Sequence, residues 1–79
     1  MFMLSICEAR EIVKSLKRDY GFTYNQIAEI INVSGNHLYH FISGSKGLRR
    51  DKISLLEKFL IDNNLTKEET INELLHNQN

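Results

Sequence analysis

Residues 23–44, TYNQIAEIINVSGNHLYHFISG, decide the fold of this 79-residue chain. Apolar residues recur at helical spacing in both halves of the stretch: Ile27, Ala28 and Ile31, then Leu38, Phe41 and Ile42. This spacing predicts two short helices, each with one apolar face turned toward a core. Because only a few residues separate the two halves, we predict a helix-turn-helix, in which a tight turn joins the helices.

Polar residues and a glycine mark the ends of both predicted helices. The hydroxyl of Thr23 can accept a hydrogen bond from a free backbone N–H, so Thr23 is the expected N-cap of the first helix. Asn32 tolerates the left-handed conformation that ends a helix, and Val33 then fills the gap between the helices. Ser34 is the expected N-cap of the second helix, and Gly44 is its C-terminal stop.

The spacing of these residues separates a helix-turn-helix from a generic pair of helices. Ala28 falls where the two helices cross, because only a small side chain lets the backbones approach there. The turn residue Asn32 follows four positions later, and the apolar Val33 and the cap Ser34 come directly after it. Leu38 lies four residues beyond that cap. Each apolar residue alone is ordinary core, but the combination favours the helix-turn-helix.

With these residues the chain resembles the lambda-repressor-like (Cro/repressor, XRE-type) DNA-binding domains over about residues 6–60. The matching residues are Thr23, Ile27, Ala28, Glu29, Ile31, Val33, Ser34, Leu38, Phe41 and Gly44. Two positions depart from the family pattern. Asn32 occupies the turn where the family usually has Gly, and Tyr24 stands where it commonly has a Gln that touches phosphate and braces the reading helix. Asn25 and Gln26 are the candidates to replace that Gln.

The rest of the chain predicts three further helices. Ser5 and Glu8 have capping-box spacing, so a helix is expected from Ser5 to Arg18. Its inner stripe would be Ile6, Ala9, Ile12, Val13 and Leu16, with Gly21 ending the helix and Tyr20 and Phe22 anchored in the core. Residues 43–50 form a loop that Leu48 pins to the core.

The fourth helix is expected to start at Asp51, with Ile53, Leu56, Phe59 and Leu60 as its buried stripe. Thr66 and Glu69 again have capping-box spacing, which predicts a fifth helix over about residues 67–76. The inner face of this helix would be Ile71, Leu74 and Leu75. No strand candidate appears. The predicted fold is therefore all-α, a five-helix lambda-repressor-like domain that spans residues 1–79.

Composition is typical of one globular domain, with 42% hydrophobic and 25% charged residues rather than the polar excess of a disordered chain. No apolar run approaches the ~20 residues that span a bilayer, so no membrane partner is expected. Residues 1–7, MFMLSIC, are too short and lack the basic start of a signal peptide. A single cysteine, Cys7, cannot form an internal disulfide. We therefore expect a cytoplasmic protein.

The formal net charge is zero, but the charges are unevenly distributed. The basic segment consists of Lys46, Arg49, Arg50 and Lys52 against Asp51, a local charge of +3. Residues 53–79 hold two cations and five anions, a local charge of −3. A basic patch directly after the second motif helix suits contact with a polyanion. The alternative is an ordinary solvated run of charges.

The resemblance implies which residues would meet DNA. In lambda-repressor-like domains the second helix of the motif lies in the major groove. The implied base-reading residues are Gly35, Asn36, His37, Tyr39 and His40. Asn36 is the strongest candidate, because an amide can bond adenine N6 and N7 together. A histidine could donate to guanine N7 or a phosphate, Tyr39 could contact sugar or phosphate, and Gly35 would permit close backbone approach.

The expected phosphate contacts are Tyr24, Asn25, Gln26, Ser34, Lys46, Arg49 and Arg50. Several of these residues have an alternative structural role. Asn36 could simply be solvated, and Tyr39 could pack against a neighbouring helix. His37 and His40 have a spacing that suits a metal, but no Cys or carboxylate joins them in sequence, so we expect no metal or other cofactor.

The functional expectation is a sequence-specific DNA-binding transcription regulator, a repressor of phage or mobile-element type that binds operator DNA as a homodimer. A chain this short resembles the stand-alone Cro-like regulators. The dimer surface would be residues 1–4 or the outer face of the last helix. The alternative is a protein-interaction module, an antirepressor or inhibitor on the same fold. An enzyme is not expected, because no nucleophile–base pair, carboxylate pair or phosphate loop is visible.

Overall fold

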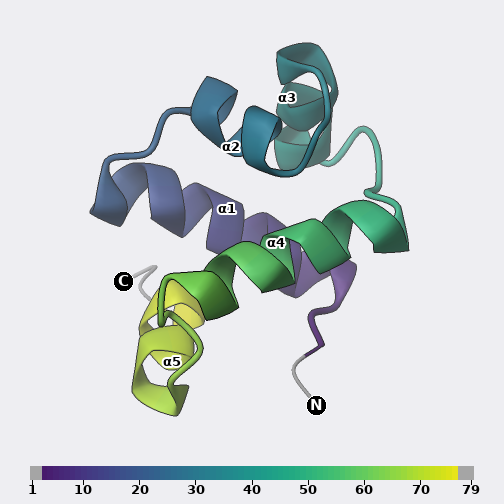
Figure 1. The fold of residues 1–79 in the computed structure, drawn as a ribbon. Helices are drawn as coiled ribbons and strands as arrows, with labels where there is room; N and C mark the ends of the chain where they lie inside the picture. Colours follow the sequence, from purple (N-terminus) through teal and green to yellow (C-terminus); the bar gives the residue numbers. More distant parts are fainter. Residues whose placement is uncertain (1–2, 77–79) are drawn as a thin grey trace.

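Residues 3–76, the part of the chain that the computed structural model describes, contain five α-helices joined by loops and no strand (Figure 1). The helices are α1 (Ile6–Tyr20), α2 (Tyr24–Ile30), α3 (Gly35–Ser43), α4 (Arg50–Asp62) and α5 (Glu68–His76). The all-α prediction is confirmed, and each predicted helix boundary lies within two residues of the observed one. None of these helices is long and apolar enough to cross a membrane.

Capping boxes begin the first two helices. The Ser5 hydroxyl accepts from the Glu8 N–H at 3.1 Å, and the Glu8 carboxylate accepts from the Ser5 N–H at 2.9 Å, as predicted. Thr23 caps α2 in the same way, accepting from the Gln26 N–H at 3.0 Å. The Gln26 side chain completes this box by accepting from the Thr23 N–H at 2.8 Å, a structural role in place of the expected phosphate contact.

The turn between α2 and α3 has the predicted backbone. Asn32 adopts a left-handed conformation, with φ of 58°. Val33 lies half-buried against the core, and its N–H donates to the Ala28 carbonyl at 2.9 Å. The Ser34 hydroxyl accepts from the His37 N–H at 3.0 Å and so caps α3. These contacts fix the direction in which α3 leaves the turn.

One continuous core joins the five helices. Its buried side chains are Leu4; Ala9, Ile12, Val13 and Leu16 of α1; Ile27, Ala28 and Ile31 from α2 and its end; Leu38 and Phe41 of α3; Leu48; Ile53, Leu56 and Leu60 of α4; and Leu74 of α5. Helix α1 packs against all four other helices. The burial of Leu48 confirms that the loop between α3 and α4 is pinned to the core.

Two residues predicted to lie in the core are exposed. Ile6 is 45% exposed, because it faces the α3–α4 loop at Gly47, where there is no side chain to cover it. Tyr20 is 43% exposed, because it is the last residue of α1 and the chain turns away at Gly21. Phe22 instead reaches the core side and meets Phe59 edge-to-face, with ring centroids 5.5 Å apart.

A polar clamp holds the N-terminal segment against α4. Glu57 is buried, and its carboxylate accepts from the Leu4 N–H at 2.8 Å. The guanidinium of Arg50 pairs with the same carboxylate and donates to the Leu4 carbonyl at 2.7 Å. Both backbone groups of the buried Leu4 are thereby satisfied, which is what permits its burial. No hydrophobic pattern signals this arrangement in the sequence.

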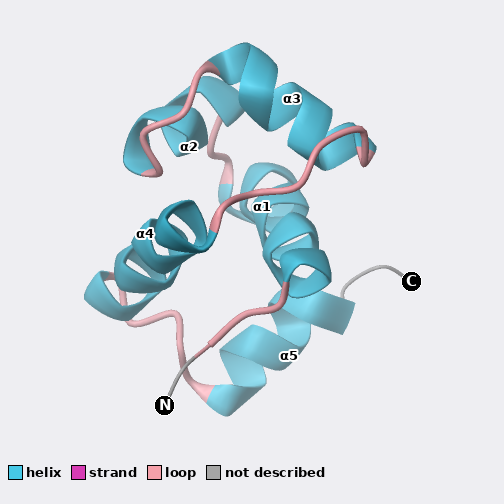
Figure 2. Ribbon diagram, turned by 90° about the vertical axis from the view of Figure 1, so that its right-hand side faces the viewer, coloured by secondary structure: helices cyan, strands magenta, loops and turns pink. Residues whose placement is uncertain are grey.

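The helices are arranged so that α3 and α5 lie at opposite ends of the molecule (Figures 1 and 2). Helix α2 lies beside α3 at one end, and α1 and α4 occupy the middle. Helix α5 is fastened to α1, because the buried Ser15 hydroxyl donates to the Leu74 carbonyl at 2.5 Å. Helix α5 therefore does not cover the side of α3 that faces away from the core.

Candidate nucleic-acid interface

Helix α3 presents a polar face to solvent. Leu38 and Phe41 are fully buried, and this fixes the rotation of the helix about its axis. The opposite side carries what we call the outer face of α3, which consists of Gly35, Asn36, Tyr39, His40 and Ser43. These residues lie on one side because they recur at spacings of three and four. Four of them are exposed, and His40 is half-buried.

Four of the five predicted base-reading residues belong to this outer face. Tyr39 is 63% exposed, so the alternative in which it packs against another helix is wrong. Its ring meets the His40 ring edge-to-face, with centroids 5.7 Å apart. The fifth residue, His37, is half-buried and lies at the border between the outer face and the core. Asn36 is exposed at the second position of α3, near the end that follows the turn.

Gly35 allows a close approach between α2 and α3. A Cβ atom at this position would lie 2.9 Å from the side-chain oxygen of Asn25 in α2. That distance is too short for an undistorted contact, so the Asn25 amide occupies the space that a larger residue would need. Asn25 and Asn36 consequently bring two exposed amides to the same end of α3.

The other polar residues predicted at the start of α2 have partners within the protein. Gln26 completes the α2 capping box. Tyr24 is half-buried, and the ammonium of Lys17 lies 5.4 Å from the centre of its ring. Ser34 caps α3. These side chains therefore help to build the α2–α3 unit and to hold its two helices in register.

Lys46 lies at the C-terminal end of α3. Gly44 ends the helix with φ of 88°, and the backbone N–H groups of Ser45 and Lys46 both donate to the His40 carbonyl, at 2.9 and 3.2 Å. The loop is thus folded back onto the last turn of α3. The Lys46 side chain belongs to an exposed residue of this loop, so its charge is accessible beside the outer face.

Two more cations come from the start of α4. The Arg49 side chain is 83% exposed and pairs with the exposed Asp51 at 3.5 Å. Such an exposed pair contributes only about 0–1 kcal/mol, so it does not hold Arg49 in place. The Lys52 ammonium donates to the Asn32 carbonyl at 3.0 Å, which brings α4 against the turn that precedes α3. Lys46 and Lys52 therefore flank the two ends of α3.

Arg50 is placed differently from its neighbour Arg49. Its guanidinium is engaged with Glu57 and the Leu4 carbonyl, and Glu57 balances its charge. We therefore leave Arg50 out of the candidate interface. Lys52, which belongs to the basic segment but was not among the predicted phosphate contacts, takes its place because of its contact with the α2–α3 turn.

Arg10 supports α3 from behind, and sequence reasoning missed this role. Its Nε–H donates to the Phe41 carbonyl at 2.8 Å, and its guanidinium carbon lies 4.9 Å from the centre of the Phe41 ring. A cation at the C-terminal end of a helix also interacts favourably with the helix dipole. In the sequence, Arg10 falls outside the apolar stripe of α1 and looks like a solvated residue. Its partner in α3 becomes apparent only when the two helices are packed together.

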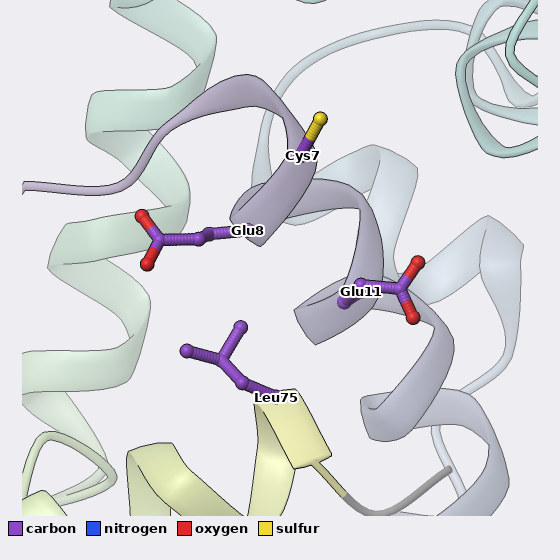
Figure 3. A pocket seen from close by; sticks show the side chains of 4 residues that line it. All are labelled: Cys7, Glu8, Glu11 and Leu75. Carbon is purple, nitrogen blue, oxygen red and sulfur yellow. The ribbon is translucent and has the colours of Figure 1, made fainter.

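A pocket of about 250 Å³ lies between α1 and α5 (Figure 3), and α5 is at the end of the molecule opposite α3 (Figure 1). It is lined by Cys7, Glu8, Glu11 and Leu75. Figure 3 shows the Leu75 side chain rising toward α1, with the two carboxylates on either side. In residues 3–76 no group of three His, Cys, Asp or Glu side chains is arranged to hold a metal ion.

Comparison with known proteins gives no match to this chain, whether among protein-family models, curated proteins or solved structures. A functional proposal therefore rests on the outer face of α3, the cations beside it and the resemblance of residues 23–44 to a known motif.

Proposed function

We propose that the chain is a lambda-repressor-like DNA-binding regulator in which α2 and α3 form the helix-turn-helix and α3 reads the major groove. One observation carries the proposal. The outer face of α3 is largely exposed and polar, with the exposed Lys46 at its C-terminal end and the ammonium of Lys52 on the turn at its N-terminal end. A major groove about 12 Å wide admits such a helix, with base edges in front of it and phosphates on both sides.

The phosphate contacts in this proposal come from Lys46, Arg49 and Lys52. Arg49 is also the N-cap of α4, and its side chain makes no capping hydrogen bond. The first N–H groups of α4 therefore lack a side-chain acceptor, and a helix N-terminus of this kind favours a phosphate. Phosphate contacts fix the position of the protein on the duplex, and base contacts supply the sequence preference.

The charge distribution supports the same orientation. The acidic residues Glu68, Glu69 and Glu73 belong to α5, at the end of the molecule opposite α3. A molecule of zero net charge can thus present a positive end to DNA and keep its negative end away from the phosphates. Zero net charge argues against indiscriminate coating of nucleic acid, and it suits a protein whose binding depends on one surface.

The proposed regulator binds as a homodimer on a two-fold operator. One module reads few base pairs, and half-sites about 34 Å apart accommodate two copies. Both subunits must present α3 on the same side, so pairing uses the sides of α1 and α5 rather than the far end of α5. Residues 1–4 were one predicted dimer surface, and Met1 and Phe2 lie outside the described residues. Leu4 is buried within its own subunit, so Met3, which is 59% exposed, is the described residue of this segment that could contact a second subunit.

A titration into labelled duplex DNA at two salt concentrations tests this proposal. With about three cations per subunit we expect a slope of roughly −5 in log K against log salt for a dimer. The oligomeric state of the protein is measured alongside, by sedimentation with and without DNA. Absence of binding even at low salt would contradict the proposal.

A second candidate function is a protein-interaction module, such as an antirepressor or inhibitor. The observation that favours it is the α1–α5 pocket, where an apolar floor at Leu75 lies between the carboxylates of Glu8 and Glu11. Met3 and Ile6 add exposed apolar surface in the N-terminal segment of the chain. An apolar segment of another protein would suit this surface, because both carboxylates already have partners within the chain. Absence of DNA binding at low salt would favour this second function over the first.

A further inference from the structure

We infer that the outer face of α3 selects A·T base pairs at the centre of its half-site. The inference rests on the proposed DNA-binding function and names the class of sequence bound. Its basis is chemical: residues 35–43, GNHLYHFIS, contain no Arg, Lys, Asp or Glu. The positive charge of the interface lies entirely beside the reading surface, on residues 46–52.

The major groove offers each base a preferred side-chain partner. Guanine is bound through O6 and N7 by the paired donors of Arg or by Lys, and cytosine N4 donates to Asp or Glu. None of these four residue types is present on the outer face. Adenine is bound through N6 and N7 by an amide, and the thymine methyl group accepts apolar contact. On the outer face, Asn36 is the partner for adenine and Tyr39 the partner for the thymine methyl group, whereas His40 and Ser43 can bond either type of base pair and do not set a preference.

Asn36 is the residue that would bind adenine. It is exposed in the first turn of α3, the part of a reading helix whose side chains contact the base edges. The Asn25 amide beside Gly35 lies at the same end and can bind a neighbouring adenine or hold Asn36 in place. A carboxamide presents one acceptor and one donor side by side, which matches adenine N6–H and N7 and mismatches guanine O6 and N7.

Tyr39 would supply the thymine contact. It lies three residues after Asn36 on the same face, is 63% exposed, and has its ring oriented by edge-to-face contact with His40. An aromatic ring in this position can meet the C5-methyl group of the thymine on the opposite strand. His40 does not change the preference, because one ring N–H can donate to N7 of adenine and of guanine alike.

Selection from random-sequence duplexes with the full chain tests the inference. We expect A·T pairs to be enriched at the central positions of each half-site. Replacing the selected thymines by deoxyuridine removes the C5-methyl groups and should weaken binding, and a Tyr39→Ala variant should lose that difference. Equal binding to both duplexes would remove Tyr39 from the reading set.

A change of preference gives the sharpest test of Asn36. The Asn36→Ala variant should lose its discrimination against a G·C pair at one position by about 5- to 150-fold. The Asn36→Arg variant should prefer guanine at that same position, a gain that unfolding cannot produce. Asn72→Ala, an exposed asparagine on α5, is the matched control and should keep the original preference.

The possible outcomes distinguish failure of the A·T preference from failure of the DNA-binding function. Salt-dependent binding with G·C pairs enriched at the centre of the half-site would overturn the A·T inference and leave the DNA-binding function intact. Salt-dependent binding with no enriched sequence would also overturn it. No binding to any duplex at low salt would overturn the DNA-binding function itself, and the inference with it.

Discussion

Arg49 and Arg50 are adjacent in sequence, yet their side chains have separate surroundings. Arg49 extends into solvent at the start of α4, where it pairs with the exposed carboxylate of Asp51. Arg50 turns toward the protein and joins the carboxylate of Glu57, which is buried. The same residue type thus forms only an exposed ion pair at position 49 and a structural clamp at position 50.

Alanine substitutions at these two positions should therefore have different consequences. Arg49→Ala should leave the free energy of unfolding within about 0.5 kcal/mol of its original value, because the residue is exposed. It should make the salt slope of DNA binding shallower by about one for each Arg49 that contacts a phosphate. Denaturant unfolding and DNA titrations at several salt concentrations measure the two quantities.

Arg50→Ala should lower the free energy of unfolding by about 1–3 kcal/mol, because Glu57 loses a hydrogen-bonded partner in a buried position. The salt slope should remain unchanged, measured at a temperature where the variant is folded. The assignment would be wrong if Arg50→Ala altered the slope and kept full stability, or if the two arginines behaved alike.

At the scale of elements, the α2–α3 unit depends on close contact between short helices. Ala28 is 3% exposed in α2, and its carbonyl accepts the Val33 N–H that closes the turn. Leu38 and Phe41 fill the space below α3, and Arg10 holds its last turn. A helix of seven residues such as α2 is too short to be stable alone, so packing must supply its stability.

The Ala28→Leu variant tests this dependence. A larger side chain at a fully packed position should lower the free energy of unfolding by about 1–3 kcal/mol. Because the added volume lies between α2 and its neighbours, DNA binding should weaken even where the variant remains folded. The Leu55→Ala variant is a control at a partly exposed apolar position of α4 and should cost less. Full stability of Ala28→Leu would show that the helices do not approach closely there.

Helix caps, turns and most of the core could be predicted from the sequence. Caps and turns depend on near neighbours, so Ser5, Thr23, Ser34 and the left-handed Asn32 are recognisable from local pattern. Periodicity likewise identifies most of the core. It misassigned Ile6, because helical spacing does not report that Gly47 is the residue across from it.

Polar contacts between residues far apart in the chain could not be predicted from the sequence. Glu57 meets Leu4 across 53 residues, and Arg10 meets the Phe41 carbonyl across 31. The sequence does not distinguish a solvated charged residue from a paired one. Its partner depends on how the helices pack against each other. For this reason four of the five residues on the outer face of α3 could be named from the sequence, with His37 placed there in error, and the separate positions of Arg49, Arg50 and Lys52 could not.

At the scale of the whole molecule, the two ends have different chemistry. The α3 end carries uncharged hydrogen-bonding side chains with cations beside them, and the α5 end carries acidic side chains. The pocket that favours a protein partner opens between α1 and α5, away from α3. A single chain could use both surfaces together, with DNA at one and a second subunit or another protein at the other.

The central claim is that α3 is the part of the chain that contacts DNA. The most direct test is an NMR titration of the ¹⁵N-labelled protein with a duplex obtained by selection. We expect the largest amide shift changes in Gly35–Ser43 and in residues 46–52, with Asn72→Ala giving the same pattern. If the protein binds the duplex while the amides of α3 remain unshifted, and the changes fall elsewhere, α3 is not the reading helix and the proposed function is contradicted.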